Sequence, residues 1–127
     1  MDLKDFSTKK ANEGAELTLL HPVTGELLDA KIKLLGQDSE VYVRESNKIV
    51  DRRIKTLRNR NAKKLTAAET NEENKQLYAA VTVGWSGFKN HGKEIEFSRQ
   101  NVLDVYAKEP WILEQVEDFV EDRANFL

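Results

Sequence analysis

The stretch that decides the fold is Ala15 to Gly36, AELTLLHPVTGELLDAKIKLLG. Apolar and charged residues alternate from Leu28 to Leu34, and this period of two is typical of a strand with one wet face. The turn chemistry of 22–25 lies before it, because proline fixes φ and glycine accepts a positive φ. With the apolar run at 17–20, the pattern predicts a β-hairpin. A lone hairpin is marginal in water, so we expect it to pack on the helices that follow.

The next segment carries the signals of a long helix. Asp38 or Ser39 can cap its first turn through a side-chain oxygen. The helix could break near Ser46-Asn47, and the capping box Thr66-Ala67-Ala68-Glu69 starts the next helical piece. The residues that recur at helical spacing are Val43, Val50, Ile54, Leu57, Asn61 and Leu65.

Glycines interrupt the helical pattern in the second half. Val81-Thr82-Val83 could end a helix or form a short strand, and we interpret 84–96 as an ordered loop. Ser98 then caps a helix, and Pro110 suits the first turn of the last one.

Taken together, these signals predict a single α+β domain over residues 1–127, with an N-terminal β-hairpin packed against a mainly helical remainder. The hairpin occupies 15–36 and the helical region 38–127. Residues 1–14 show no clear period, so we interpret them as a loosely held arm.

Composition bounds the class of protein. The chain has 127 residues, of which 39% are hydrophobic and 33% charged, and its net charge is -2. It can bury a core without disulfides, and it contains no cysteine. No apolar run approaches the roughly 20 residues of a membrane span, and the N-terminus lacks the apolar centre of a signal peptide. We therefore expect a cytoplasmic protein with no membrane partner.

No residue pattern indicates catalysis. His21 and His91 are the only histidines and lie far apart in sequence, which disfavours a metal site. Ser86 has a superficial nucleophile-elbow context, but Phe88 stands where that motif needs glycine. The acids within 117–122 fall on the wet face of the last helix, where their pKa values have no reason to shift. We expect no enzyme activity, no cofactor and no metal.

A basic run is the main charged feature. It has no acid between Arg52 and Lys64, so it could contact phosphates. It lacks the aromatic residues that stack on bases, which disfavours nucleic acid as the partner. The run could also meet the acidic face of the last helix, in the same or another copy. The residues predicted to make electrostatic contacts are Arg52, Arg53, Lys55, Arg58 and Arg60.

Apolar and aromatic residues of the second half form the predicted partner surface. Trp85 and Phe88 either cap the core or belong to a docking surface, and Trp111 anchors the last helix. Phe126-Leu127 is either tucked down or used for docking. The residues predicted to bind a partner are Trp85, Phe88, Trp111, Val116, Phe119, Val120 and Phe126.

Several phrases, taken in order, carry a resemblance to a known family. They are Val83-Gly84-Trp85-Ser86-Gly87-Phe88, Glu96 to Val102, Tyr106 to Ile112, Glu114-Gln115-Val116 and the closing Asp122-Arg123-Ala124-Asn125-Phe126-Leu127. Together they resemble the tail assembly chaperones of long-tailed bacteriophages over about residues 79 to 127. The first half is similar only in general character.

The resemblance implies a non-virion protein of the host bacterial cytoplasm. Such a chaperone coats the tape-measure protein before the tail-tube protein polymerises around it, and several members self-associate. Two alternatives remain open from the residues alone. One is a small nucleic-acid-binding regulator that uses the basic helix 52–64, and the other is a head–tail joining structural protein.

Overall fold

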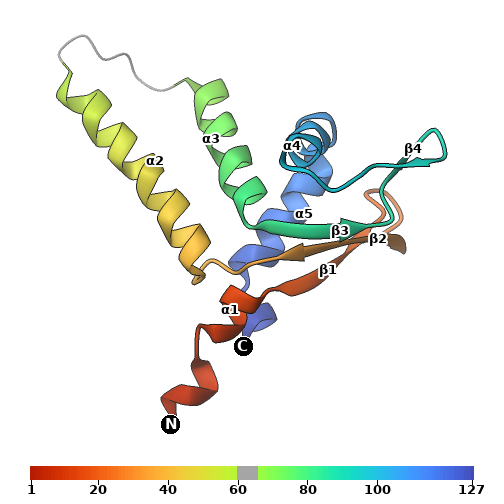
Figure 1. Ribbon diagram of the computed structural model, residues 1–127, viewed down its shortest axis with the longest axis horizontal. Helices are drawn as coiled ribbons and strands as arrows, with labels where there is room; N and C mark the ends of the chain where they lie inside the picture. The colour runs from red at the N-terminus through yellow and green to blue at the C-terminus, as the bar shows by residue number, and fades with distance from the viewer. Residues whose placement is uncertain (60–65) are drawn as a thin grey trace.

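The computed structural model describes residues 1–59 and 66–127 and has the predicted α+β class (Figure 1). Its strands are β1 Ala15–Leu20, β2 Leu27–Leu34, β3 Thr82–Ser86, β4 Lys89–Asn90 and β5 Lys93–Glu94. Its helices are α1 Lys9–Glu13, α2 Glu40–Arg58, α3 Ala67–Ala80, α4 Arg99–Lys108 and α5 Pro110–Glu121, with 3-10 turns η1 Leu3–Phe6 and η2 Arg123–Phe126.

The predicted hairpin is confirmed. Strands β1 and β2 pair antiparallel, with Leu17 opposite Ile32. The turn between them is closed by two backbone bonds, from His21 N to Glu26 O at 2.8 Å and from Gly25 N to His21 O at 2.9 Å. The alternation in β2 has its expected effect, because Ile32 and Leu34 are buried while the lysines between and beside them stay exposed.

The interpretation of 84–96 as a loop is wrong at its start. Gly84 to Ser86 belong to β3, which pairs antiparallel with β2 and makes a three-stranded sheet in the order β1-β2-β3. Gly84 lies opposite Lys33, and Trp85 lies opposite Ile32. A glycine weakens a strand by its own preference, but the ladder with β2 satisfies the backbone and overrides it. The rest of the segment forms a small hairpin of β4 and β5.

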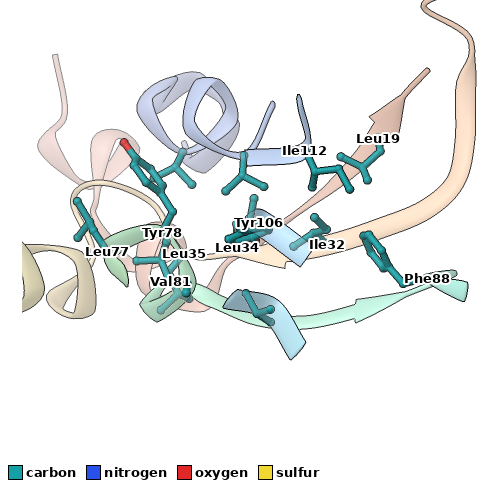
Figure 2. Packing of buried hydrophobic residues seen from close by; sticks show 14 residues of the cluster. Leu19, Ile32, Leu34, Leu35, Leu77, Tyr78, Val81, Phe88, Tyr106 and Ile112 are labelled. Atoms are coloured by element: carbon teal, nitrogen blue, oxygen red, sulfur yellow. The ribbon is translucent and has the colours of Figure 1, made fainter. Parts of the chain in front are cut away.

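The core lies where the sheet meets helices α3, α4 and α5, and Figure 2 shows its side chains as one cluster. Ile112 of α5 and Leu19 of β1 both belong to it. The side chain of Gln115 also bonds β1 directly, since its amide donates to Leu20 O at 2.8 Å and accepts from Leu20 N at 2.9 Å. Each fully buried aliphatic side chain contributes about 1.5–3 kcal/mol. The prediction that the hairpin packs on the helices is thus confirmed.

The N-terminal arm is more ordered than its sequence suggested. Residues 9–13 form α1, whose Ala11 is buried and accepts a hydrogen bond at 3.0 Å from Gly36 N. The turn η1 before it has no buried residue. Helix α1 is held on the domain by Ala11, which packs against Gly36, and by the hydrogen bond from Glu40 N to Asn12 Oδ1. Contacts of this kind leave no periodic signal.

The helix boundaries follow the predicted caps. Ser39, Thr66 and Ser98 each accept a bond from the backbone N–H three residues on, and Pro110 occupies the first turn of α5. Helix α2 runs through Ser46-Asn47 without a break. The predicted helical positions Asn61 and Leu65 lie outside the described residues. No helix within the described ranges combines the length and apolarity that a bilayer span requires.

Two glycines test how tightly β2 and the β3–β4 turn are packed. Gly87 has φ 80°, and a Cβ there would lie 2.1 Å from Asp29 O, whereas Gly92 has φ 79° and open space around it. We expect Gly92→Ala to cost about 1–2 kcal/mol, the penalty for left-handed backbone. Gly87→Ala should cost clearly more, because the carbonyl of β2 must move. Denaturant unfolding measures both, and equal losses would contradict this packing.

Candidate protein-docking surface

Four of the residues predicted to bind a partner lie in the core instead. Val116, Val120, Phe126 and Phe88 are all buried. The apolar side of α5 packs against the sheet, as amphipathic helices of globular domains do, so these side chains are already covered within the chain. The prediction of a partner surface at these four positions is therefore wrong for the folded monomer.

The aromatic pair of the glycine-rich segment caps the core. The rings of Trp85 and Phe88 stack with centroids 4.5 Å apart, and Phe97 meets Trp85 edge-on at 5.7 Å. The indole N–H of Trp85 donates to Ile95 O at 3.0 Å. With Trp85 half-buried and its polar atom satisfied, the core-capping interpretation fits better than the docking one.

Trp111 and Phe119 are neither fully buried nor fully exposed. Both are half-buried against the core cluster. The indole of Trp111 donates to Glu109 Oε2 at 2.9 Å, and Phe119 packs edge-on against Phe126 at 5.6 Å. These contacts agree with Trp111 as an anchor of α5.

The structure exposes a different apolar surface, on α2. None of the 19 residues of this helix is buried. Val43, Val50, Ile54 and Leu57 are 46%, 49%, 42% and 83% exposed. At about 100° per residue they fall within one narrow face, which we call the α2 stripe. The sequence marked these positions as the apolar side of a helix, but it did not show that this side stays open.

Helix α3 supports α2 beside the stripe, and Val50 of the stripe lines the groove between the two helices. Tyr42 meets Tyr78 of α3 edge-on with centroids 6.2 Å apart, and Arg53 Nε lies 3.8 Å from Glu73 Oε2. These residues of α2 lie about a quarter turn away from the stripe. Figure 1 shows α2 and α3 diverging from a common base.

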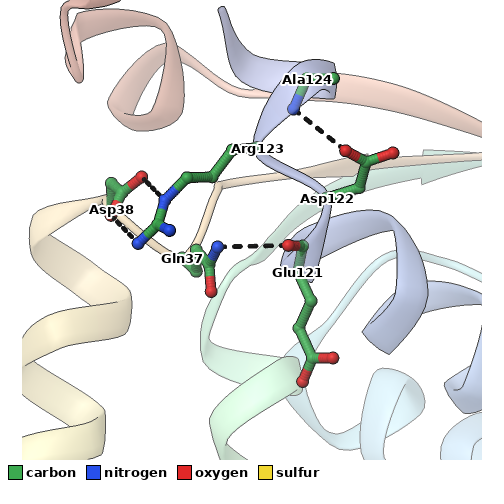
Figure 3. A network of polar contacts seen from close by, with 6 residues as sticks. All are labelled: Gln37, Asp38, Glu121, Asp122, Arg123 and Ala124. Atoms are coloured by element: carbon green, nitrogen blue, oxygen red, sulfur yellow. Dashed lines mark hydrogen bonds and ion pairs between the residues drawn. The ribbon is translucent and has the colours of Figure 1, made fainter.

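A polar clamp at the foot of α2 sets its direction (Figure 3). The guanidinium of Arg123 donates to both oxygens of Asp38, at 2.7 and 3.1 Å, one residue before the cap. The amide of Gln37 donates to Glu121 O at 3.2 Å. On the side of α1, Asn12 Oδ1 accepts from Glu40 N at 2.8 Å. Helix α1 and the segment that follows α5 thus both contact the base of α2.

Close apolar packing completes this foot. A Cβ on Gly36 would lie 2.9 Å from Phe126 and 3.0 Å from Ala11, so the turn into α2 passes between these two side chains. Ser39, the cap of α2, is fully buried beside it. The closing phrase Asp122 to Phe126 therefore serves to position α2, a role that its sequence did not reveal.

The predicted electrostatic contacts are only partly available. Arg52, Arg53, Lys55 and Arg58 are exposed on α2, while Arg60 lies outside the described residues. Arg52 and Arg53 line a groove whose other wall is Glu69, Glu72 and Glu73 of α3. Within one copy, the described part of the basic run therefore meets the acids of α3 and not those of the last helix, because α2 and α3 are neighbours. A contact with the last helix of another copy stays a prediction.

The acids of α5 are also not uniformly solvated. Glu117 accepts a hydrogen bond from Asn74 of α3, and its partial burial raises the pKa of its carboxyl. Glu121 Oε1 accepts from the Tyr78 hydroxyl at 2.7 Å. The expectation of unshifted pKa values is wrong at Glu117, because α3 packs across this part of α5 and desolvates it.

Comparison with protein-family models, curated proteins and solved structures finds no match. Across residues 1–59 and 66–127, no group of three or more His, Asp or Glu side chains could hold a metal ion. The described residues do expose the α2 stripe, and the clamp lies at the foot of the helix that carries it.

The clamp predicts a pH dependence. The hydrogen bond from Arg123 lowers the pKa of the Asp38 carboxyl. The stabilisation of the folded state by this pair is therefore complete above the unfolded pKa of about 3.9, and it is lost as pH falls through the lower native pKa. We expect Arg123→Ala to lower Tm by a constant amount between pH 5 and 8, and this difference to shrink below pH 4. Lys9→Ala, which breaks the exposed pair of Lys9 with Glu13, is the control. A difference independent of pH would contradict the assignment.

Proposed function

We propose that this chain is a tail assembly chaperone of a long-tailed bacteriophage. It holds the tape-measure protein in solution in the host bacterial cytoplasm, and the tail-tube protein displaces it as the tube polymerises. The observation that carries this proposal is the α2 stripe, an exposed apolar face on a helix with no buried residue. The resemblance over residues 79 to 127 supports it independently.

The α2 stripe is an exposed apolar surface on one side of a helix. The stripe runs from Val43 to Leu57, a length of about 21 Å at 1.5 Å per residue. Exposed apolar surface of this kind marks an interaction site, and a helix is a natural occupant because it presents its own apolar face at the same spacing. A tape-measure protein, long and rich in helices, offers such faces and would aggregate if they were left bare.

The resembling phrases and the stripe have different roles in this proposal. The phrase around Trp85 builds β3 and the aromatic cap, and the phrase around Arg123 builds the clamp. These phrases form a scaffold that holds α2 outward. Chaperones that bind different tape-measure proteins are then expected to differ in the first half of the chain, where the resemblance is weakest.

The test is co-expression with the tape-measure protein of the same phage. We expect the native chain to keep that protein in the soluble fraction, and Val50→Asp with Ile54→Asp to lose most of this effect, because a buried charge opposes helix contact. Val23→Asp, at an exposed valine of the hairpin turn, is the matched control and should behave as the native chain. Equal solubility with and without the native chain would refute the proposal.

A nucleic-acid-binding regulator is the second candidate, because Arg52, Lys55 and Arg58 are exposed and have no ion pair within the described residues. Phosphate contacts are strongest at low salt, so binding to duplex DNA at about 50 mM salt, weakening steeply as salt rises, would favour it.

A head–tail joining protein would remain in the finished particle, whereas a chaperone would not. Mass spectrometry of purified virions separates these two roles. Recovery of this chain in stoichiometric amounts would favour the joining protein.

A further inference from the structure

The α2 stripe has the spacing of a coiled-coil seam. Its residues and Asn47 follow one another in steps of four, three, four and three: Val43, Asn47, Val50, Ile54 and Leu57. This is the repeat of a and d positions, with Val43, Val50 and Leu57 at d and Asn47 and Ile54 at a. All five are exposed. A straight amphipathic helix that packs on a globular core needs no such regular repeat.

Asn47 gives the seam a register. Its side chain has no hydrogen-bond partner within the described residues. A single asparagine at an a position costs stability in a coiled coil, but it favours the one alignment that sets a polar group opposite it. A partner helix therefore has one preferred position along α2.

The foot of α2 limits where the partner can lie. Val43 and Asn47 line a groove whose opposite wall is Thr8 and Asn12. The segment 8–13 stands beside the first turn of α2, so it bounds the seam at that end. The contact is then confined to 43–57, or about two heptads.

One edge of the seam carries a charge code. Arg44, Asp51 and Arg58 lie seven residues apart at successive e positions, each directly after a d residue of the seam. The charges along this edge are therefore positive, negative and positive. None of the three forms an ion pair within the described residues. The other edge faces α3, where Arg53 is already paired with Glu73. Among the described residues the first edge keeps its charges unpaired, although Arg44 and Asp51 also line the groove that faces Thr8 and Asn12.

This code disfavours a second copy of the chain. In a parallel pair the g position of one helix faces the following e position of the other. Arg53 is at g and Arg58 is at e, so Arg53 of each copy would face Arg58 of the other copy. In an antiparallel pair the e positions face each other, which sets Arg44 against Arg58 and Asp51 against its own copy. Like charges in these positions are destabilising.

Shifting the antiparallel pair by one heptad does not help. Such a shift sets Asp51 against Arg44 or against Arg58, which is attractive. However, a shift in one direction carries Ile54 and Leu57 past Val43 of the second helix, and a shift in the other carries Val43 and Asn47 past Arg58. Each therefore uncovers one end of the stripe.

We propose that α2 forms a two-stranded coiled coil with a helix of a different protein, and that the α2 stripe is its contact face. That helix has a polar residue opposite Asn47 and a row of acidic, basic and acidic side chains facing Arg44, Asp51 and Arg58. Only the statement that the helix belongs to the tape-measure protein rests on the proposed function.

Two synthetic helical peptides test this inference against the purified full chain. Both have four heptads with leucine and isoleucine in the seam and one asparagine at an a position. Peptide one carries the row acidic, basic, acidic at the facing positions, and peptide two carries the inverse row. We expect peptide one to bind at least about tenfold more tightly, because three attractive pairs replace three repulsive ones.

A charge-inverted variant makes the test independent of peptide quality. The triple change Arg44→Glu, Asp51→Lys and Arg58→Glu should reverse the preference, so that peptide two binds more tightly. The control is Arg52→Gln, on the side of α2 opposite the stripe, which should keep the native preference and adds no acid to the groove that Glu69, Glu72 and Glu73 line. All changes are at exposed positions, and circular dichroism checks that each variant is folded.

Three outcomes would overturn the inference. They are binding of neither peptide, equal binding of both by the native chain and the triple variant, and a stable dimer of the native chain in sedimentation that Ile54→Asp dissociates. The last result would identify a second copy as the occupant.

The outcome is separate from that of the proposed function. A chain that keeps the tape-measure protein soluble but does not discriminate the peptides would retain the function and lose the coiled coil. A chain that discriminates the peptides but leaves the tape-measure protein insoluble would do the reverse.

Discussion

The joint at the foot of α2 is the constraint on which the rest of the structure depends. None of the 19 residues of α2 is fully buried, and Val41, Tyr42 and Ile49 are only partly buried against the core, so the direction of α2 depends mainly on its base and on α3. At that base Gly36 packs between Ala11 and Phe126, and the Arg123 guanidinium donates hydrogen bonds to the Asp38 carboxylate. Most helical stability in proteins comes from tertiary contacts, so the clamp and the contacts with α3 also help to keep α2 helical.

The amphipathic helices α5 and α2 differ in whether the domain covers their apolar side, and this difference explains where a partner can bind. Helix α5 follows α4 after a single residue, and its apolar side meets the sheet, where Val116 and Val120 are buried. Helix α2 contacts α3 along one side, and its stripe stays between 42% and 83% exposed within the described residues. The two patterns look alike in sequence, but only α2 keeps its apolar face free.

The position of the charges follows the same division. Helix α3 stands between α2 and α5, and it engages both through polar side chains: Glu73 toward Arg53, and Asn74 toward Glu117. It thereby occupies one edge of α2 and desolvates part of α5. What remains open is the far edge of α2, with Arg44, Asp51 and Arg58. Selectivity for a partner therefore depends on a few charges beside an apolar seam.

The sequence alone determined the hairpin, the α+β class and the helix caps, since each depends on residues within a few positions of one another. It also contained the repeat of the α2 stripe, which sequence reasoning treated as an ordinary helical side. Tertiary structure decided that Gly84 to Ser86 form a strand, that Val116 and Val120 are core, and that the stripe stays uncovered. These outcomes depend on contacts between segments tens of residues apart, and local preferences carry no information about which surfaces will meet.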